Sequence, residues 1–173
     1  MSTGDASVEI VRYDEAWPDL FEEEWRKLLG IIAPWLAGPI EHIGSTAVPG
    51  LAAKPVIDIM AGVASLDASR PALPVLAGLD YCYFPYRPDS EHWFCKPSPL
   101  FRTHHLHLVP FGTVQWVGAI AFRDYLRAHP ETAAEYQELK TRLAGAFQFD
   151  REAYTQAKGP FVTRVTALAL RQL

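Results

Sequence analysis

Two apolar segments that flank a polar corner constrain the fold more than any other part of this sequence. Residues 39–44, PIEHIG, and residues 55–63, PVIDIMAGV, have the composition of β-strands, and STAVPGLAAK, residues 45–54, connects them. A buried carboxylate is costly unless it has a partner, yet Asp58 lies in the middle of the second segment. Asp58 therefore either has a structural partner or faces a site that uses its charge.

The corner after the first segment has the features of a phosphate-binding turn. Gly44 permits close backbone approach, and a short helix after it would present free N–H groups to an anion. The hydroxyls of Ser45 and Thr46 add donors, and Lys54 would balance phosphate charge. With Asp58 on the neighbouring strand and able to hold Mg²⁺, this is the minimum apparatus of phosphoryl or nucleotidyl transfer.

Side-chain alternation along the second segment assigns its residues to two faces. Val56, Asp58 and Met60 share one face, and Ile57 and Ile59 share the other. Two well-known phosphate-binding patterns, the P-loop and the dinucleotide-binding G-x-G-x-x-G, are absent from the connecting loop. We therefore interpret the Gly44 corner from its own residues and assign it to neither of these patterns.

Composition is that of one globular domain covering residues 1–173. Hydrophobic residues make up 49% of the chain and charged residues 21%, and the net charge of −4 does not favour a nucleic-acid partner. No apolar run is long enough for a membrane helix, and residues 1–17 lack the apolar stretch of a signal peptide, so we expect a cytoplasmic protein that does not bind membranes. Cys82 and Cys95 are expected to be reduced thiols.

Periodicity predicts strands in the first two thirds of the chain and helices in the last third. The other expected strands are residues 8–13 at a sheet edge, the hairpin formed by 81–86 and 91–97, which places Cys82 opposite Cys95, and 103–111. The expected helices are 14–36, one within 66–79, 117–130, 131–147 and 151–173. This order predicts an α/β or α+β fold in which helices pack on a mixed β-sheet.

Three histidines on the 103–111 strand provide a second candidate feature. His105 and His107 share one face, whereas His104 lies on the other. With Asp58 they make a conceivable mixed site for a transition metal, as in a metal-dependent hydrolase of phosphorylated substrates. In the alternative interpretation, which we favour, these histidines pair with Glu41, Asp58 or phosphate groups and bind no metal.

The remaining charged and aromatic residues allow simpler interpretations. Lys54, Arg102 and Lys158 are candidates for binding a triphosphate, and otherwise are solvated surface cations. The aromatic stretch 81–95 is interpreted as cross-strand core packing, and His42 as a hydrogen-bonded core residue. The glutamates at 22–24 and the charges of the last two helices are interpreted as solvated faces.

Five stretches of the chain together form a recognisable pattern. The main one is IEHIGSTAVPGLAAKPVIDI, residues 40–59. The others are VRYDEAWPDLFEEE at 11–24, RTHHLHLV at 102–109, FRDYLRAHPETAAEYQELK at 122–140 and YTQAKGPFV at 154–162. These stretches resemble the GrpB-like proteins, which are grouped with the nucleotidyltransferase superfamily. The resemblance therefore covers nearly the whole chain and implies a nucleotidyltransferase-like fold.

The resemblance also implies roles for particular residues. The superfamily pattern is Gly-Ser, about a dozen residues, and then Asp-x-Asp or Asp-x-Glu; Gly44, Ser45 and Asp58 match it, but Met60 stands where the second acid is expected. A thioether is a poor ligand for Mg²⁺, so a two-metal arrangement cannot form on this strand. Lys158 matches the family's Tyr-x-x-x-Lys pattern.

Two functions follow from the resemblance. In the first, Gly44, Ser45 and Thr46 hold the phosphates of a nucleoside triphosphate and Asp58 binds Mg²⁺ or Mn²⁺. Lys54, Arg102 or Lys158 offsets charge at the α-phosphate during transfer to an unknown acceptor. In the second, catalysis is lost and the protein binds a nucleotide or a CoA-like phosphorylated metabolite. Family members that look fused to dephospho-CoA kinases suit the second function.

Overall fold

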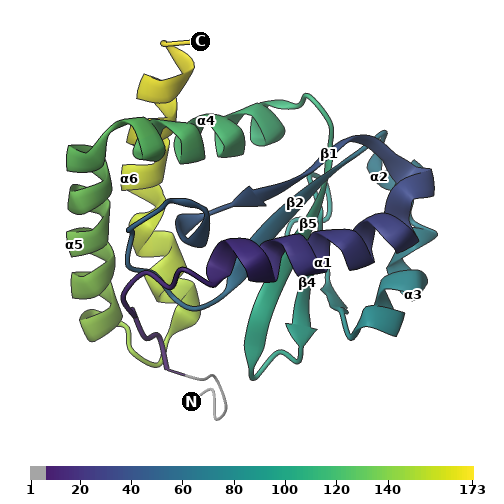
Figure 1. Ribbon diagram of the computed structural model, residues 1–173, viewed down its shortest axis with the longest axis horizontal. Helices are drawn as coiled ribbons and strands as arrows, with labels where there is room; N and C mark the ends of the chain where they lie inside the picture. The colour runs from purple at the N-terminus through teal and green to yellow at the C-terminus, as the bar shows by residue number, and fades with distance from the viewer. Residues whose placement is uncertain (1–6) are drawn as a thin grey trace.

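A five-stranded mixed β-sheet forms the centre of the protein (Figure 1). A computed structural model describes residues 7–173, so the first six residues of the N-terminal stretch lie outside the described part. Across the sheet the strands are β1 (Leu36–Ile43), β2 (Ile57–Val63), β5 (Arg102–Pro110), β4 (His92–Pro97) and β3 (Cys82–Phe84). Only the central pair, β2 and β5, is parallel, which confirms the predicted mixed sheet.

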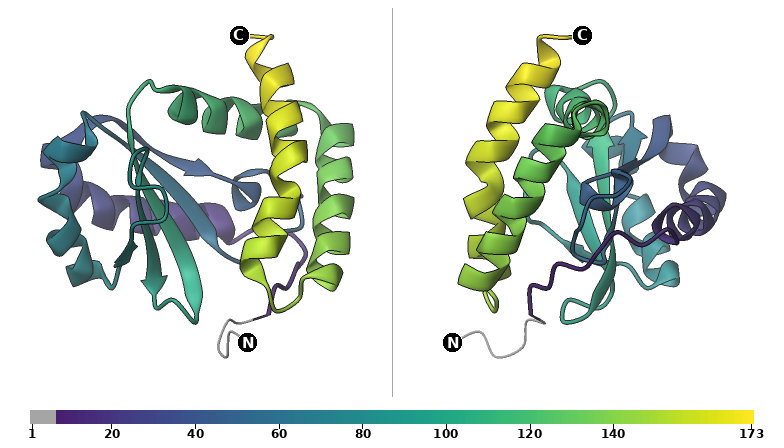
Figure 2. Two further views of the ribbon diagram at one scale, coloured as in Figure 1. Left: turned by 180° about the vertical axis from the view of Figure 1, so that it is seen from behind. Right: turned by 60° about the vertical axis from the view of Figure 1, so that its left-hand side comes forward.

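Helices cover both faces of this sheet. On one face lie α1 (Trp17–Ile32), α2 (Leu66–Ser69) and α3 (Ala72–Leu76). The last third of the chain is helical, as predicted, and contributes α4 (Val114–Ala128), α5 (Pro130–Ala146) and α6 (Arg151–Leu170). Figure 2 shows the sheet between α1 on one side and α4, α5 and α6 on the other. No helix within residues 7–173 has the length and apolar character needed to span a membrane.

Strand alternation puts the main hydrophobic core on the α1 face. Ile57 and Ile59 of β2 pack there with Leu106 of β5 and with Leu28 of α1, all almost fully buried. The other face of β2 and β5 carries Asp58, Met60, His105 and His107, because these strands pair in register residue by residue. The predicted division of β2 into two faces is therefore confirmed.

The prediction of a strand at residues 8–13 was wrong. Val11 makes one isolated bridge to Ala53, and Val8 instead packs against Tyr154 of α6. Residues 66–79 are helical in part, as predicted, but they form two short helices, because Pro71 cannot continue α2 and instead precedes α3. The register of Cys82 opposite Cys95 is confirmed.

One acidic residue of α1 is part of the core instead of the solvated face predicted for it. Glu24 is only 2% exposed, and it accepts hydrogen bonds from the Tyr81 hydroxyl at 2.9 Å and from Lys96 Nζ at 2.5 Å. Glu22 and Glu23 are exposed and pair with cations one turn along the helix, as predicted. The three neighbouring glutamates differ because successive helical residues point about 100° apart, so only one faces the sheet.

Candidate functional site

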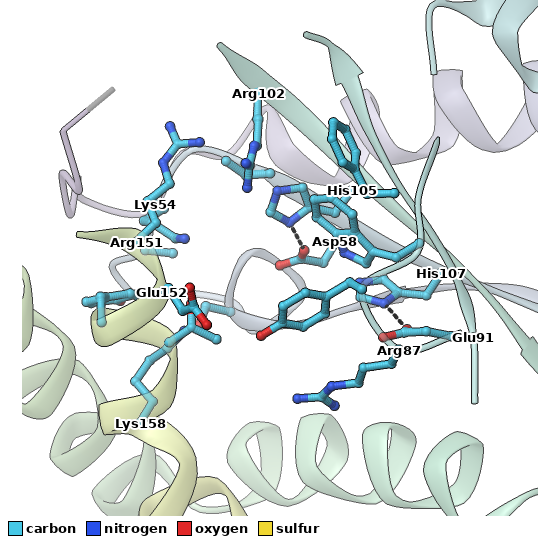
Figure 3. A pocket seen from close by; sticks show the side chains of 18 of the residues that line it. Lys54, Asp58, Arg87, Glu91, Arg102, His105, His107, Arg151, Glu152 and Lys158 are labelled. Atoms are coloured by element: carbon cyan, nitrogen blue, oxygen red, sulfur yellow. Dashed lines mark hydrogen bonds and ion pairs between the residues drawn. The ribbon is translucent and has the colours of Figure 1, made fainter. Parts of the chain in front are cut away.

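A pocket of about 580 Å³ lies between the open face of the sheet and the first turns of α6 (Figure 3). Eight of the residues singled out from the sequence line it: Ser45, Thr46, Lys54, Asp58, Arg102, His105, His107 and Lys158. They come from the β1–β2 connection, from β2 and β5, and from α6, which are separated by more than a hundred residues of chain. The fold therefore brings these candidate residues into one cavity.

The Gly44 corner lies directly against Asp58. Gly44 has φ 70° and ψ −169°, a backbone conformation that is almost restricted to glycine. A Cβ atom at this position would lie 2.6 Å from Asp58 Oδ2, so only glycine allows this approach. The short helix expected after the corner is the 3-10 turn Ser45–Ala47. The Gly44 corner and the Asp58 carboxylate are therefore packed in direct contact.

Thr46 stabilises this corner from inside. Thr46 is only 1% exposed, and its hydroxyl oxygen lies 2.9 Å from His42 Nε2. His42 stacks on Phe21 and is buried, as predicted, and burial lowers its pKa to about 4, so it is neutral at pH 7. The Ser45 side chain also has a partner, because it hydrogen-bonds with Tyr136 of α5, so both hydroxyls of the corner are held by neighbouring side chains.

Asp58 is ionised despite its enclosed position. Its side chain is 29% exposed, and Oδ1 lies 2.9 Å from His105 Nδ1. Burial acts to raise the pKa of this carboxyl, but the hydrogen bond and charge of His105, with the nearby His107 and Lys54, lower the pKa to about 2. Asp58 therefore carries a full negative charge at neutral pH.

The two histidines on the pocket face of β5 each pair with a carboxylate. His105 pairs with Asp58, and His107 Nδ1 lies 2.6 Å from Glu91 Oε2 (Figure 3). Burial keeps the pKa of His105 below its usual value, whereas the bond to Glu91 raises the pKa of His107 against the effect of burial. Glu41, named as another possible partner, instead accepts a hydrogen bond from Arg123 at 2.7 Å.

Side chains that could hold a metal ion are few in this pocket, and the predicted group of Asp58, His105 and His107 is not arranged as a metal site. Among residues 7–173, no three His, Cys, Asp or Glu side chains are grouped to hold a metal ion. Mg²⁺ is commonly bound by one or two carboxylates together with waters and substrate phosphates, and Asp58 fits that role. Met60 cannot assist, because it is 1% exposed and packs against Val109 and Trp116.

Basic side chains dominate the charge of the pocket. Six basic side chains line it, compared with the three acids Asp58, Glu91 and Glu152; the basic residues are Lys54, Arg87, Arg102, Lys140, Arg151 and Lys158. Lys54 and Lys158 lie over the ring of Tyr154, with Nζ 5.1 and 4.5 Å from its centroid. Burial, together with the charge of Lys54, lowers the pKa of Lys158 to about 8. The pocket therefore favours a polyanionic ligand.

Sequence reasoning missed Lys140, whose helix was expected to carry only solvated charges. Lys140 is 1% exposed, its Nζ donates to the carbonyl of Ala52 at 2.5 Å, and burial and its neighbouring lysines lower its pKa to about 7. A signal was available, because Tyr136, Lys140 and Ala144 are spaced by four residues and form the buried stripe of α5.

The aromatic stretch 81–95 was predicted to be core packing, and this was wrong for part of it. Tyr81 and Phe94 are buried in the main core. Phe84, Tyr86 and Trp93 instead line the pocket, and Arg87 from the same hairpin joins them there. The two sets separate because alternate residues of a strand point to opposite faces of the sheet.

The family is established by the match of residues 7–168 to the family described as "GrpB protein". The chain belongs to the GrpB family. It is 41% identical to a UPF0157 protein of Pseudomonas aeruginosa, covering 96% of this chain and 69% of that one. It is 36% identical to the glutamate-rich protein GrpB of Alkalihalophilus pseudofirmus, covering 90% and 92%.

Solved structures agree with this membership of the GrpB family. The crystal structure of the conserved protein GrpB from Enterococcus faecalis superposes with a TM-score of 0.86 at 33% identity, covering 95% of this chain and 98% of that one. A chain of the GLD-2/RNP-8 complex superposes with a TM-score of 0.53 at 13% identity, covering 85% and 58%. The second match shows a shared fold alone.

Proposed function

We propose that this GrpB-family protein binds a nucleoside triphosphate or a similar phosphorylated ligand, together with a divalent metal ion, and transfers a nucleotidyl group to an acceptor. One observation carries the proposal: an ionised carboxylate, Asp58, lies against the Gly44 corner in a pocket lined by six basic side chains. Polyphosphate is the ligand class that uses both features, because the cations bind its oxygens and the carboxylate completes a metal site.

Each side chain has a definite task in this reaction. Ser45, Arg102 and Lys158 hold the phosphates, and Lys54 offsets the charge that develops at the α-phosphate. The acceptor oxygen forms a bond to the α-phosphorus, the bond to the bridging oxygen breaks, and pyrophosphate leaves. A metal ion on Asp58 would supply further neutralisation of the phosphate oxygens.

The second candidate function is a binding module that has lost catalysis. Met60 supports it, because the position of the second acid is filled by an apolar side chain packed under Trp116. A relative from Mycolicibacterium paratuberculosis is named "Dephospho-CoA kinase"; it is 28% identical, and the chain covers 44% of its length. That name favours a CoA-like phosphorylated metabolite as the ligand of a module.

Calorimetric titration with ATP separates the two functions. Wild type is titrated with and without Mg²⁺, and so is Asp58→Asn, which keeps the size of the side chain but removes its charge. The matched control is Asp67→Asn, because Asp67 is an exposed aspartate of α2 outside the pocket. Loss of Mg²⁺-dependent binding only in Asp58→Asn supports the transferase, and unchanged tight binding supports the module. If wild type binds neither ATP nor other phosphorylated metabolites, both candidates are wrong.

A further inference from the structure

The β3–β4 hairpin divides its aromatic side chains between the two faces of the sheet. Phe84 pairs with Trp93, and Trp93 pairs with His107, so these residues share the face that carries Asp58. Tyr83 pairs with Phe94 on the opposite face, where Phe94 belongs to the core. The aromatic residues on the pocket face are therefore not part of the hydrophobic core that stabilises the sheet.

Two of these pocket-facing aromatic side chains are exposed. Tyr86 is 52% exposed and Phe84 is 37% exposed, although burying such rings would stabilise the fold. Trp93 contacts both, with ring centroids 6.2 Å from Tyr86 and 6.0 Å from Phe84. The planes are tilted by 51° and 60°, so neither ring stacks flat on Trp93. None of the three rings therefore covers the face of another, although a guanidinium group lies over Trp93 and another over Tyr86.

Basic groups accompany the rings at this end of the pocket. The Arg102 guanidinium lies 5.4 Å from the centroid of Trp93, and that of Arg87 lies 5.4 Å from the centroid of Tyr86. Lys54 and Lys158 lie on the other side of the cavity, towards α6 (Figure 3). The cavity volume of about 580 Å³ is within the range of small-molecule sites. The pocket thus has an aromatic end and a lysine-rich end.

We propose that Phe84, Tyr86 and Trp93 form a stacking site for the nucleobase of the phosphorylated ligand, whose phosphates extend from Arg102 towards the lysines. The inference rests on the proposed function, because it assigns one part of the ligand to one part of the same pocket. Stacking on aromatic rings tolerates different bases, since every base has a π-face. The site therefore provides affinity for the base without strong selection among bases.

Tyr86→Ala tests the stacking site, because Tyr86 is the most exposed of the three rings and lies outside the strands. ATP and inorganic tripolyphosphate are titrated in parallel, with Mg²⁺ present. We expect Tyr86→Ala to weaken ATP binding about tenfold, as for the loss of one stacked base, and to leave tripolyphosphate binding unchanged. Tyr83→Ala is the control, because Tyr83 is 37% exposed on the opposite face of the same hairpin.

Two further variants make the result specific. Tyr86→Trp keeps a flat ring and should retain ATP affinity, and Phe84→Ala should weaken ATP binding as Tyr86→Ala does. Equal ATP affinity in wild type, Tyr86→Ala and Phe84→Ala would overturn the stacking site while leaving a proposed function in place. A wild-type protein that binds neither ATP nor tripolyphosphate would instead overturn the proposed function, and the stacking site with it.

Discussion

Gly44→Ala is the substitution whose effect follows most directly from the structure. The φ of 70° and ψ of −169° at Gly44 cost a residue with a side chain about 1–3 kcal/mol. The new Cβ would also lie 2.6 Å from Asp58 Oδ2, so the carboxylate would have to move away from the corner. That movement also disturbs the 2.9 Å hydrogen bond between Asp58 and His105.

The expected loss of unfolding free energy is about 2–3 kcal/mol, since both effects act on one site. For a chain of this length, each kcal/mol corresponds to about 2–4 °C in Tm, so Tm should fall by about 4–12 °C. Because Asp58 is displaced, Mg²⁺-dependent binding of ATP should also weaken by about tenfold or more. Differential scanning calorimetry and titration calorimetry measure the two effects.

Gly30→Ala is the matched control for this experiment. Gly30 lies in α1, where a Cβ would meet no atom within 4 Å and φ is not positive. Alanine should stabilise the helix there by about 0.5–1 kcal/mol and leave ligand binding unchanged. If Gly44→Ala melts at the wild-type temperature and binds ATP normally, the contact between Gly44 and the Asp58 carboxylate does not require glycine at position 44, and the reasoning is refuted.

Three further predictions concern charge and burial. Binding of tripolyphosphate should weaken from pH 6.5 to pH 9, because Lys140 and Lys158, with pKa values of about 7 and 8, lose their positive charge over that range; a constant affinity in titrations across the range would contradict this. Met60→Asp should destabilise the fold by several kcal/mol without producing transferase activity, because position 60 is buried under α4; a stable, active variant in melting and turnover assays would refute it. Glu24→Ala should cost about 3–5 kcal/mol in urea unfolding, because it leaves the largely buried Lys96 without its carboxylate, and a change below 1 kcal/mol would count against a structural role.

Much of the fold could be predicted from the sequence, because the patterns involved are local. The two-residue period of 55–63 assigned Asp58 and Met60 to one face, and the helical periods in the last third located α4, α5 and α6. The Gly44 corner was also recognisable, because a glycine and two hydroxyl side chains directly follow an apolar strand segment. These features depend on backbone geometry within about twenty residues.

Tertiary structure decided which charged and aromatic side chains reach the pocket. Lys140 and Glu24 looked like surface residues, and only packing of their helices against other elements revealed that both are buried. The hairpin aromatics were assigned to the core as one group, although strand pairing places Phe84 and Trp93 on the pocket face. A side chain's surroundings depend on contacts with segments distant in the chain, and local sequence patterns do not specify those contacts. The sequence by itself determined the strands and the corner, and the packing of α5, α6 and the hairpin around them made a cationic pocket.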